Sequence, residues 1–235
     1  ELLYQSIKSV NAEAIIMARQ SHANLNNKRY FTTLQATDTT VDYDFNRAMC
    51  CILRSFTQNL NDCTKIPASG SCTSPDDKEE NFAKNLGSTI MTGIPFLSID
   101  LFKTSEEKLD VIKNWLSFYR EHMNDLINGE FRPLTFDLNF SALRIESDNK
   151  AFVGMFGDAP IKAHLTRSFN DIYVINGTAS EEFAAILTNQ RGRYMVTTYT
   201  RHLVPLETRE VETKNNQLFL DISIPEGAMA KLQKT

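Results

Sequence analysis

The sequence predicts an α/β segment followed by an all-β domain, with a boundary near residue 132. Up to that point amphipathic helices alternate with short apolar runs, as in the strand–helix units of an α/β layer. After it, helical periodicity stops, and short runs rich in β-branched and aromatic residues are separated by turn signals. We therefore expect part of an α/β structure at residues 1–132 and an antiparallel β-sandwich at residues 133–235.

The clearest strand–helix unit lies between residues 93 and 133. Its apolar run, Ile94 to Leu101, is typical of a buried parallel strand. The helix after it is predicted to begin with Thr104 as N-cap and Glu107 closing a capping box, and to end at Gly129. One such unit cannot bury its own apolar faces, so we expect similar units before it.

The segments before this unit are shorter and less regular. Residues 45–56 and the stretch from Asp76 to Gly93 carry helical apolar stripes, and acidic residues begin the second of these helices. The stretch from Thr57 to Pro75 is rich in Asn, Ser, Gly and Pro, which is typical of a long loop. Residues 2–10 are weakly helical, and residues 30–34 form either a short strand or a loop segment.

Composition narrows the classes of function. The chain has 235 residues, 42% of them hydrophobic, and a net charge of −4 disfavours nucleic acid or an anionic membrane as main partner. No apolar run approaches the roughly eighteen residues of a membrane span. The sequence starts at Glu1 without an initiator methionine, so we expect upstream sequence or processing. Both a cytoplasmic and a secreted location stay open.

Cysteine and histidine placement argues against a metal centre. Cys50 and Cys51 are adjacent in an apolar helical run, which indicates core packing. Cys63 and Cys72 bracket a polar loop and could pair in an oxidising compartment. The sequence contains neither a CxxC motif nor a Cys/His cluster, and its four histidines are scattered. We expect no metal and no cofactor.

Three segments together resemble the α-galactosidases (melibiases) of glycoside hydrolase family 36. They are ATDTTVDYDFNR at 36–47, SPDDKEENFAKNLGSTIMTGIPFLSIDL at 74–101 and WLSFYREHMNDLINGEFRP at 115–133. Members of that family pair a (β/α)8 (TIM) barrel with a C-terminal antiparallel β-sandwich. The resemblance covers most of the chain and implies the C-terminal part of a barrel at 1–132, followed by the sandwich domain at 133–235.

The resemblance also implies a reaction, the retaining hydrolysis of terminal α-glycosides. Such enzymes need one carboxylate as nucleophile and a second as acid and then base. In the family, the acid/base aspartate follows a barrel strand in a Thr-Ser-Asp-like motif, and Ala36-Thr37-Asp38 is the similar place here. The resemblance therefore implies Asp38 as the acid/base, while the residues alone leave open that Asp38 caps the following helix or is simply solvated.

Three further residues are candidates for substrate binding. The family carries a Cys and a Gly-rich segment with an Arg upstream of its acid/base aspartate. The matching place here, Met17 to His22, has no Cys and no Gly, so the preference for galactose is the least supported part of the resemblance. Arg19 could still reach a sugar hydroxyl, His22 could line the site, and Asp42 matches the surroundings of the acid/base motif.

The nucleophile of the family is missing from this sequence. It lies on an earlier strand, in a Lys-Trp-Asp type motif, and a complete barrel needs about 250 residues. We expect the nucleophile to come from upstream sequence or from a partner chain, and this chain alone to be inactive. The alternative is a non-catalytic carbohydrate-binding or structural relic of such an enzyme. Either way, the expected ligand is an oligosaccharide or glycoside, with no nucleic-acid or membrane partner.

Overall fold

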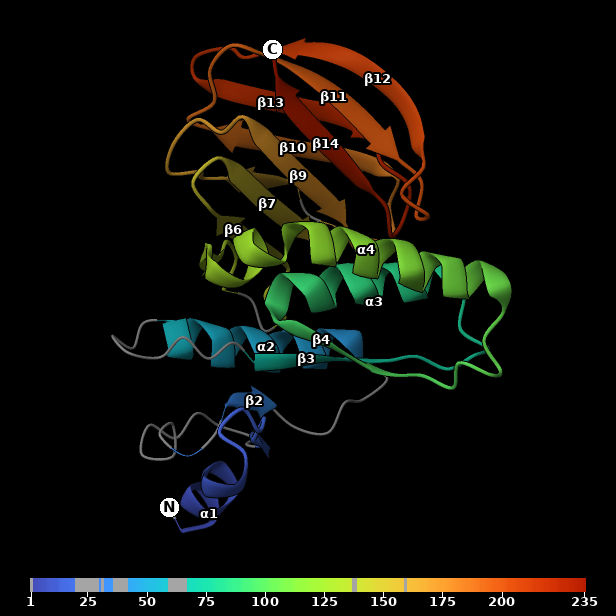
Figure 1. Ribbon diagram of the computed structural model, residues 1–235. Coiled ribbons are helices and arrows are strands. Elements are labelled where there is room, and N and C mark those ends of the chain that lie inside the picture. The colour runs from blue at the N-terminus through green and yellow to red at the C-terminus, as the bar shows by residue number, and fades with distance from the viewer. Residues whose placement is uncertain are drawn as a thin grey trace.

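The computed structural model describes residues 2–19, 30, 32–35, 42–58, 67–136, 139–158 and 160–235. These residues form a mixed α/β structure with three β-sheets. The sheets of the C-terminal half lie at one end of the molecule, two long helices cross its middle, and a parallel sheet lies on their other side (Figure 1). Within the described residues, no helix is long and apolar enough to cross a membrane.

The N-terminal half contains a four-stranded sheet in the order β1-β2-β3-β4, and all of its pairings are parallel. Spatial order follows sequence order, as it does in successive strand–helix units of an α/β layer. The strands are β1 Met17–Arg19, β2 Thr33–Gln35, β3 Pro67–Cys72 and β4 Ile94–Ser98. The helices are α1 Leu2–Val10, α2 Tyr43–Gln58, α3 Glu79–Thr92 and α4 Glu106–Asn128.

The predicted helices are present, and the start of α4 is corrected by one residue. Its N-cap is Ser105 and not Thr104. The Thr104 hydroxyl instead donates to the Asp100 carbonyl at 2.8 Å, inside the turn that precedes the helix. Because the cap lies one residue later, Glu107 does not occupy the capping-box position that the sequence predicts for it. The helix ends at Asn128 with Gly129 as its C-cap, as predicted.

Two predictions about strands were wrong. The stretch from Thr57 to Pro75, predicted as a loop, contains β3, whose small polar residues pair with β2 on one side and β4 on the other. β4, predicted as buried, leaves Ile94 39% and Phe96 41% exposed. β4 is the outermost strand of its sheet, and Ile94, Phe96 and Ser98 share its more exposed face, because alternate residues of a strand point to the same side.

The C-terminal half consists of two sheets packed on one core. A seven-stranded sheet has the order β12-β11-β14-β9-β7-β6-β5, and a three-stranded sheet has the order β13-β10-β8. The pairings are antiparallel except for β7 with β9 and β8 with β10. The strands are β5 Glu130–Pro133, β6 Ala142–Glu146, β7 Lys150–Met155, β8 Ile161–Ala163, β9 Asp171–Asn176, β10 Glu182–Thr188, β11 Arg193–Tyr199, β12 Pro205–Glu212, β13 Gln217–Ser223 and β14 Met229–Lys234.

A second core joins the two halves of the chain. Helices α3 and α4 lie on the face of the seven-stranded sheet that points away from the three-stranded sheet (Figure 1). Phe82 and Trp115 from the helices pack there with Phe152 and Ile175 from the strands. The predicted boundary at residue 132 lies within β5. Where one domain ends and the other begins stays a prediction.

Candidate functional site

The carboxyl ends of the four parallel strands lie along one edge of their sheet. Ligand sites of α/β folds gather at this edge, on the loops that follow the strands. β1 ends at Arg19, β2 at Gln35, β3 at Cys72 and β4 at Ser98. The predicted site residues lie in the segments that follow β1 and β2, or at the end of β1 itself. We call this region the carboxyl edge.

The predicted site residues are described in part. Asp38 and His22 lie outside the described residues. Arg19 is the last residue of β1 and is aligned with Gln35 of β2. Asp42 is exposed, and its Oδ1 accepts a hydrogen bond from the Phe45 amide at 2.9 Å. The cap of α2 is therefore Asp42, four residues after the aspartate for which the sequence left that role open. The catalytic and sugar-binding roles of these four residues stay predictions.

The loop after β3 brings a further carboxylate to the carboxyl edge. Asp77 accepts hydrogen bonds from the Tyr43 hydroxyl at 2.9 Å and from the Ser74 amide at 3.0 Å. Because Tyr43 is the first residue of α2, this carboxylate fixes the start of α2 against the loop before α3. From the sequence, the acidic run at 76–80 predicts only the start of a helix. The Ser-x-x-Asp spacing of Ser74 and Asp77 is the turn signal that would have indicated the loop.

The turn after β4 is organised by Asp100. Its carboxylate Oδ1 accepts a hydrogen bond from the Phe102 amide at 3.2 Å, and its backbone carbonyl accepts one from the Lys103 amide at 3.2 Å. The turn leaves the Phe102 side chain fully exposed. The sequence predicts a strand that continues to Leu101. In the structure β4 ends at Ser98, and the carboxylate of Asp100 stabilises a turn after it.

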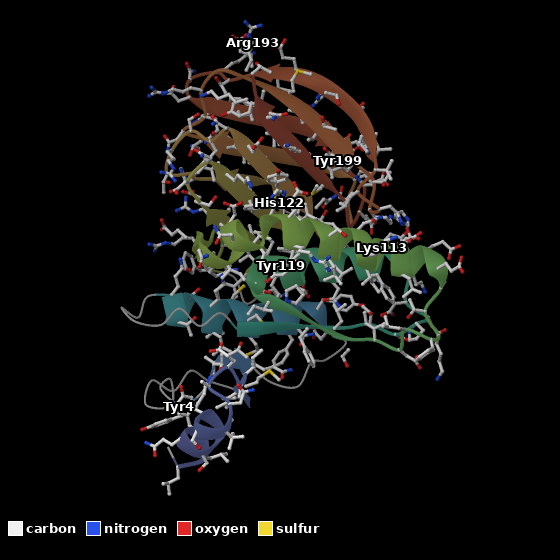
Figure 2. All side chains as sticks on the ribbon, viewed as in Figure 1. Tyr4, Lys113, Tyr119, His122, Arg193 and Tyr199 are labelled. Carbon is white, nitrogen blue, oxygen red and sulfur yellow. The ribbon has the colours of Figure 1, made fainter. Side chains whose placement is uncertain are left out.

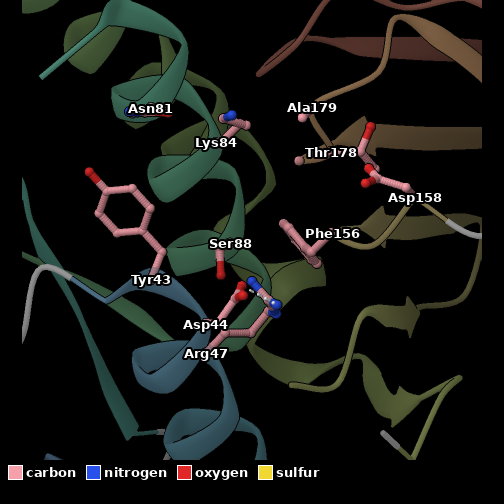
Figure 3. Close-up of a pocket in the computed structure, with 11 residues that line it drawn as sticks. Tyr43, Asp44, Arg47, Asn81, Lys84, Ser88, Phe156, Asp158, Thr178 and Ala179 are labelled. Carbon is pink, nitrogen blue, oxygen red and sulfur yellow. Dashed lines mark hydrogen bonds and ion pairs between the residues drawn. The ribbon is translucent and has the colours of Figure 1, made fainter. Parts of the chain in front are cut away.

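A polar cleft opens between the starts of α2 and α3 and the loops of the seven-stranded sheet (Figure 3). Its volume is about 230 Å³. A neighbouring hollow of about 380 Å³ shares Asn81 and Lys84 with it and continues to Asp77 in the loop after β3. Lys84 forms an ion pair with Glu226 at 3.2 Å, which links α3 to the loop before β14.

One wall of the cleft is held rigidly by Arg47. Its Nη2 lies 2.6 Å from the Asp44 carboxylate, its Nε donates to the Asn139 carbonyl at 2.9 Å, and its guanidinium lies 4.7 Å from the centre of the Phe156 ring. The ring packs so closely on Gly177 that a Cβ there would lie 2.2 Å from a ring atom. Cations, carboxylates and an aromatic ring edge together suit a ligand rich in hydroxyl groups.

In the second hollow, Glu80 is poorly suited to act as a general acid. A hydrogen bond from its own backbone amide at the start of α3 lowers the pKa of Glu80, and Arg201, 2.8 Å away, lowers it further. A carboxylate of this kind stays ionised near neutral pH and is a poor proton donor. Among the described residues, no group of three or more His, Cys, Asp and Glu side chains could hold a metal ion.

No family model matches the sequence, and no curated protein is significantly similar to it. The structure, by contrast, is similar to solved glycoside hydrolases. An α-amylase from Anoxybacillus superimposes over the whole chain with a TM-score of 0.62 and 11% sequence identity. A GH27 β-L-arabinopyranosidase from Geobacillus stearothermophilus, solved in complex with arabinose, does so with a TM-score of 0.56 and 10% identity.

The likeness extends over only part of these enzymes. The chain spans 55% of the α-amylase and 53% of the arabinopyranosidase, about half of each. At such low identity the similarity concerns the fold and not the substrate. The chain therefore has a glycosidase-like fold, shared with about half of each of these two glycoside hydrolases.

Proposed function

We propose that this chain is the C-terminal part of a retaining glycoside hydrolase of α-galactosidase type, which acts on terminal α-glycosides. The observation that carries the proposal is the similarity in fold, over the whole chain, to about half of each of two glycoside hydrolases. The three segments that resemble family 36 support the narrower assignment. The first two directly follow β2 and β3 of the parallel sheet, and the third contains the end of α4 and β5.

In the proposed mechanism, Asp38 serves first as acid and then as base. A nucleophilic carboxylate attacks the anomeric carbon while Asp38 gives its proton to the departing glycosidic oxygen, and a covalent glycosyl–enzyme intermediate forms. Asp38 then removes a proton from the water that attacks the same carbon, which releases the sugar and restores both carboxyl groups. Asp42, Arg19 and His22 are the proposed sugar-binding groups beside it.

The proposed nucleophile comes from outside these 235 residues, in further sequence or in a partner chain. The parallel sheet supports a covering layer of that kind. Ile94 and Phe96 of β4 are more than a third exposed, as is Met17 of β1 at the opposite edge of the sheet. Apolar groups on an open sheet usually pack on another layer.

The alternative is a non-catalytic protein that binds carbohydrate or packs on another chain. The fold and the exposed sheet residues are compatible with either function. A non-catalytic protein would lack the nucleophilic carboxylate, and without that second carboxylate retaining hydrolysis does not occur. A turnover assay therefore distinguishes the two functions, whereas a sugar-binding assay does not.

The test is hydrolysis of para-nitrophenyl α-galactoside by the natural full-length polypeptide. We expect turnover, and we expect Asp38→Asn to lower kcat by about 10²- to 10⁴-fold, the usual value of a general acid–base group. Asp148→Asn is the matched control, because Asp148 is an exposed residue of the turn between β6 and β7. Undiminished turnover in Asp38→Asn would contradict the assigned role. Sugar binding without any turnover of α-glycosides would support the non-catalytic alternative.

A further inference from the structure

A second pocket lies on the other side of the helical layer, between α4 and the seven-stranded sheet. Its volume is about 310 Å³, and it is lined by residues of α4, β9, β11, β14 and the loop between β11 and β12. Figure 2 labels His122 and Tyr199 in this region, where α4 meets the strands. Helices α3 and α4 lie between the seven-stranded sheet and the parallel sheet (Figure 1). The pocket is lined by α4 and the seven-stranded sheet, so it is distinct from the carboxyl edge.

The floor of the pocket is aromatic and fixed. The rings of Phe118, His122 and Tyr173 contact one another with centroids 4.7 to 5.4 Å apart, and Phe152 stacks on Tyr173 at 5.1 Å with an interplanar angle of 10°. All four side chains are buried. Such a cluster keeps its shape without a ligand, which reduces the entropy cost of binding one.

Two tyrosine hydroxyls line this pocket without a protein partner. Tyr173 is 4% exposed and Tyr199 is about half-buried, yet neither hydroxyl forms a hydrogen bond with any described residue. Burial raises the pKa of both phenols, so both hydroxyls stay protonated and can donate as well as accept. Neither hydroxyl oxygen is among the fully buried unpaired atoms, so both are open to the pocket, where a ligand hydroxyl can take the place of water.

His122 adds a donor. Its Nδ1 lies 3.4 Å from the ammonium group of Lys150, which can only donate, so Nδ1 is the acceptor. In the neutral ring the proton is then on Nε2. Burial and, next, the charge of Lys150 lower the pKa of His122, which favours the neutral form. The pocket therefore offers an imidazole N–H beside two phenolic hydroxyls.

We propose that this pocket binds a neutral sugar unit of an oligosaccharide. Sugars combine apolar C–H faces with hydroxyl edges, which match an aromatic floor and neutral donors and acceptors. The charged residues of the lining, Glu121 and Lys231, have opposite signs, and Lys231 also lies 3.8 Å from the Asp171 carboxylate. That balance favours an uncharged ligand over an anion or a cation. The pocket does not depend on Asp38 or on hydrolysis.

The test is titration of methyl β-D-galactopyranoside, which an enzyme for α-glycosides does not hydrolyse, into the natural full-length polypeptide. Binding is followed by NMR at the methyl group of Met229, which lines this pocket. We expect saturable binding, weakened about 2- to 10-fold in Kd by Tyr173→Phe and by Tyr199→Phe, the value of one hydrogen bond each. Neither substitution removes a hydrogen bond within the described protein, so the melting temperature should not fall.

Tyr119→Phe is the matched control. Tyr119 lies on α4, which forms one side of the pocket, and its hydroxyl has no partner among the described residues, but it does not line the pocket. Its substitution should leave the Kd unchanged. No saturable binding, or binding that both Tyr173→Phe and Tyr199→Phe leave intact, would overturn the proposal. Turnover assays of Asp38 variants report on the carboxyl edge instead, so the two proposals fail separately.

Discussion

His122 shows how a residue that looks like a surface group becomes part of the core. It falls in the polar part of the α4 sequence, where we would place a surface or interdomain side chain. The structure leaves it only 3% exposed, between Phe118 of its own helix and Tyr173 of the seven-stranded sheet, which agrees with the interdomain alternative and not with the surface one. Its position could not be read from helical periodicity, because the partner surface comes from strands more than 25 residues away along the chain.

The buried imidazole predicts a stability that falls in acid. Burial lowers its folded-state pKa below the usual value near 6.5, with Lys150 adding to the effect. Below about pH 6.5 the unfolded chain takes up this proton more readily than the folded one, so the free energy of unfolding decreases. The loss is complete once the pH passes the folded-state pKa, and each tenfold difference in proton affinity is worth about 1.4 kcal/mol.

Urea unfolding between pH 7.5 and 5 checks this expectation. His122→Gln should flatten the dependence of the unfolding free energy on pH. His164→Gln is the control for the substitution itself, because it makes the same change at an exposed position. Equal slopes in His122→Gln and the unaltered protein would show that His122 is not responsible.

At the candidate site, two contacts have a local signal in the sequence, although neither was predicted from it. The helix cap at Asp42 lies next to the helix that it serves, and the Ser-x-x-Asp turn at Ser74 and Asp77 is equally local. The link between Tyr43 and Asp77 joins residues 34 positions apart and needs the parallel sheet to bring them together. No spacing rule for a single element predicts that contact.

Among the elements, the amphipathic helices were predictable and the strands only in part. The helix predicted at 45–56 is α2, and the apolar runs at 151–156, 171–176, 194–199 and 217–224 overlap β7, β9, β11 and β13. β3 was missed because Pro67–Cys72 has no apolar alternation, and pairing on both sides forms the strand instead. β12 is exposed along nearly its whole length, so no buried face marks it in the sequence.

The end of α4 depends on a close approach that only glycine allows. Gly129 has φ −65° and ψ 153°, which any residue can adopt, so backbone conformation does not require glycine there. A Cβ at this position would instead lie 2.5 Å from the Asp125 carbonyl oxygen and 2.6 Å from Cγ2 of Ile145. The close packing around Gly129, and not its backbone conformation, therefore requires glycine between α4 and β5.

Gly129→Ala should accordingly destabilise the protein by about 1–3 kcal/mol, the usual cost of overpacking. Urea unfolding at pH 7.5 measures the effect. Asn124→Ala, an exposed position one turn earlier in α4, should change the unfolding free energy by less than about 0.5 kcal/mol. If the two variants were equally stable, the close approach at Gly129 would not be the reason for its glycine.

For the whole molecule, the order of α/β and all-β segments was predictable because each class has its own hydrophobic period. The stacking of α3 and α4 on the seven-stranded sheet was not, since both surfaces look like ordinary apolar faces in sequence. The open parallel sheet could not be foreseen either. The run Ile94 to Leu101 is apolar enough for a buried strand, and only the sheet order shows that β4 is at an edge.

The uncovered face of the parallel sheet predicts that these 235 residues associate when they are produced alone. Ile94→Thr combined with Phe96→Thr should reduce that association, because both exposed side chains lie on one face of β4. Light scattering after size-exclusion chromatography measures it. Phe219→Thr removes an equally exposed aromatic side chain from the sandwich and should have little effect. A chain that stays monomeric at high concentration would contradict the need for a covering layer.

Rescue of Asp38→Asn by azide tests the proposed enzyme most directly. The substrate is para-nitrophenyl α-galactoside, the protein is the natural full-length polypeptide, and product formation is followed by NMR. If Asp38 is the acid/base of a retaining enzyme, azide should replace water at the glycosyl–enzyme intermediate, speed up the slow variant and yield α-galactosyl azide. Asp148→Asn should not respond. An Asp38→Asn variant that turns over normally, or that gains nothing from azide, would contradict the central claim.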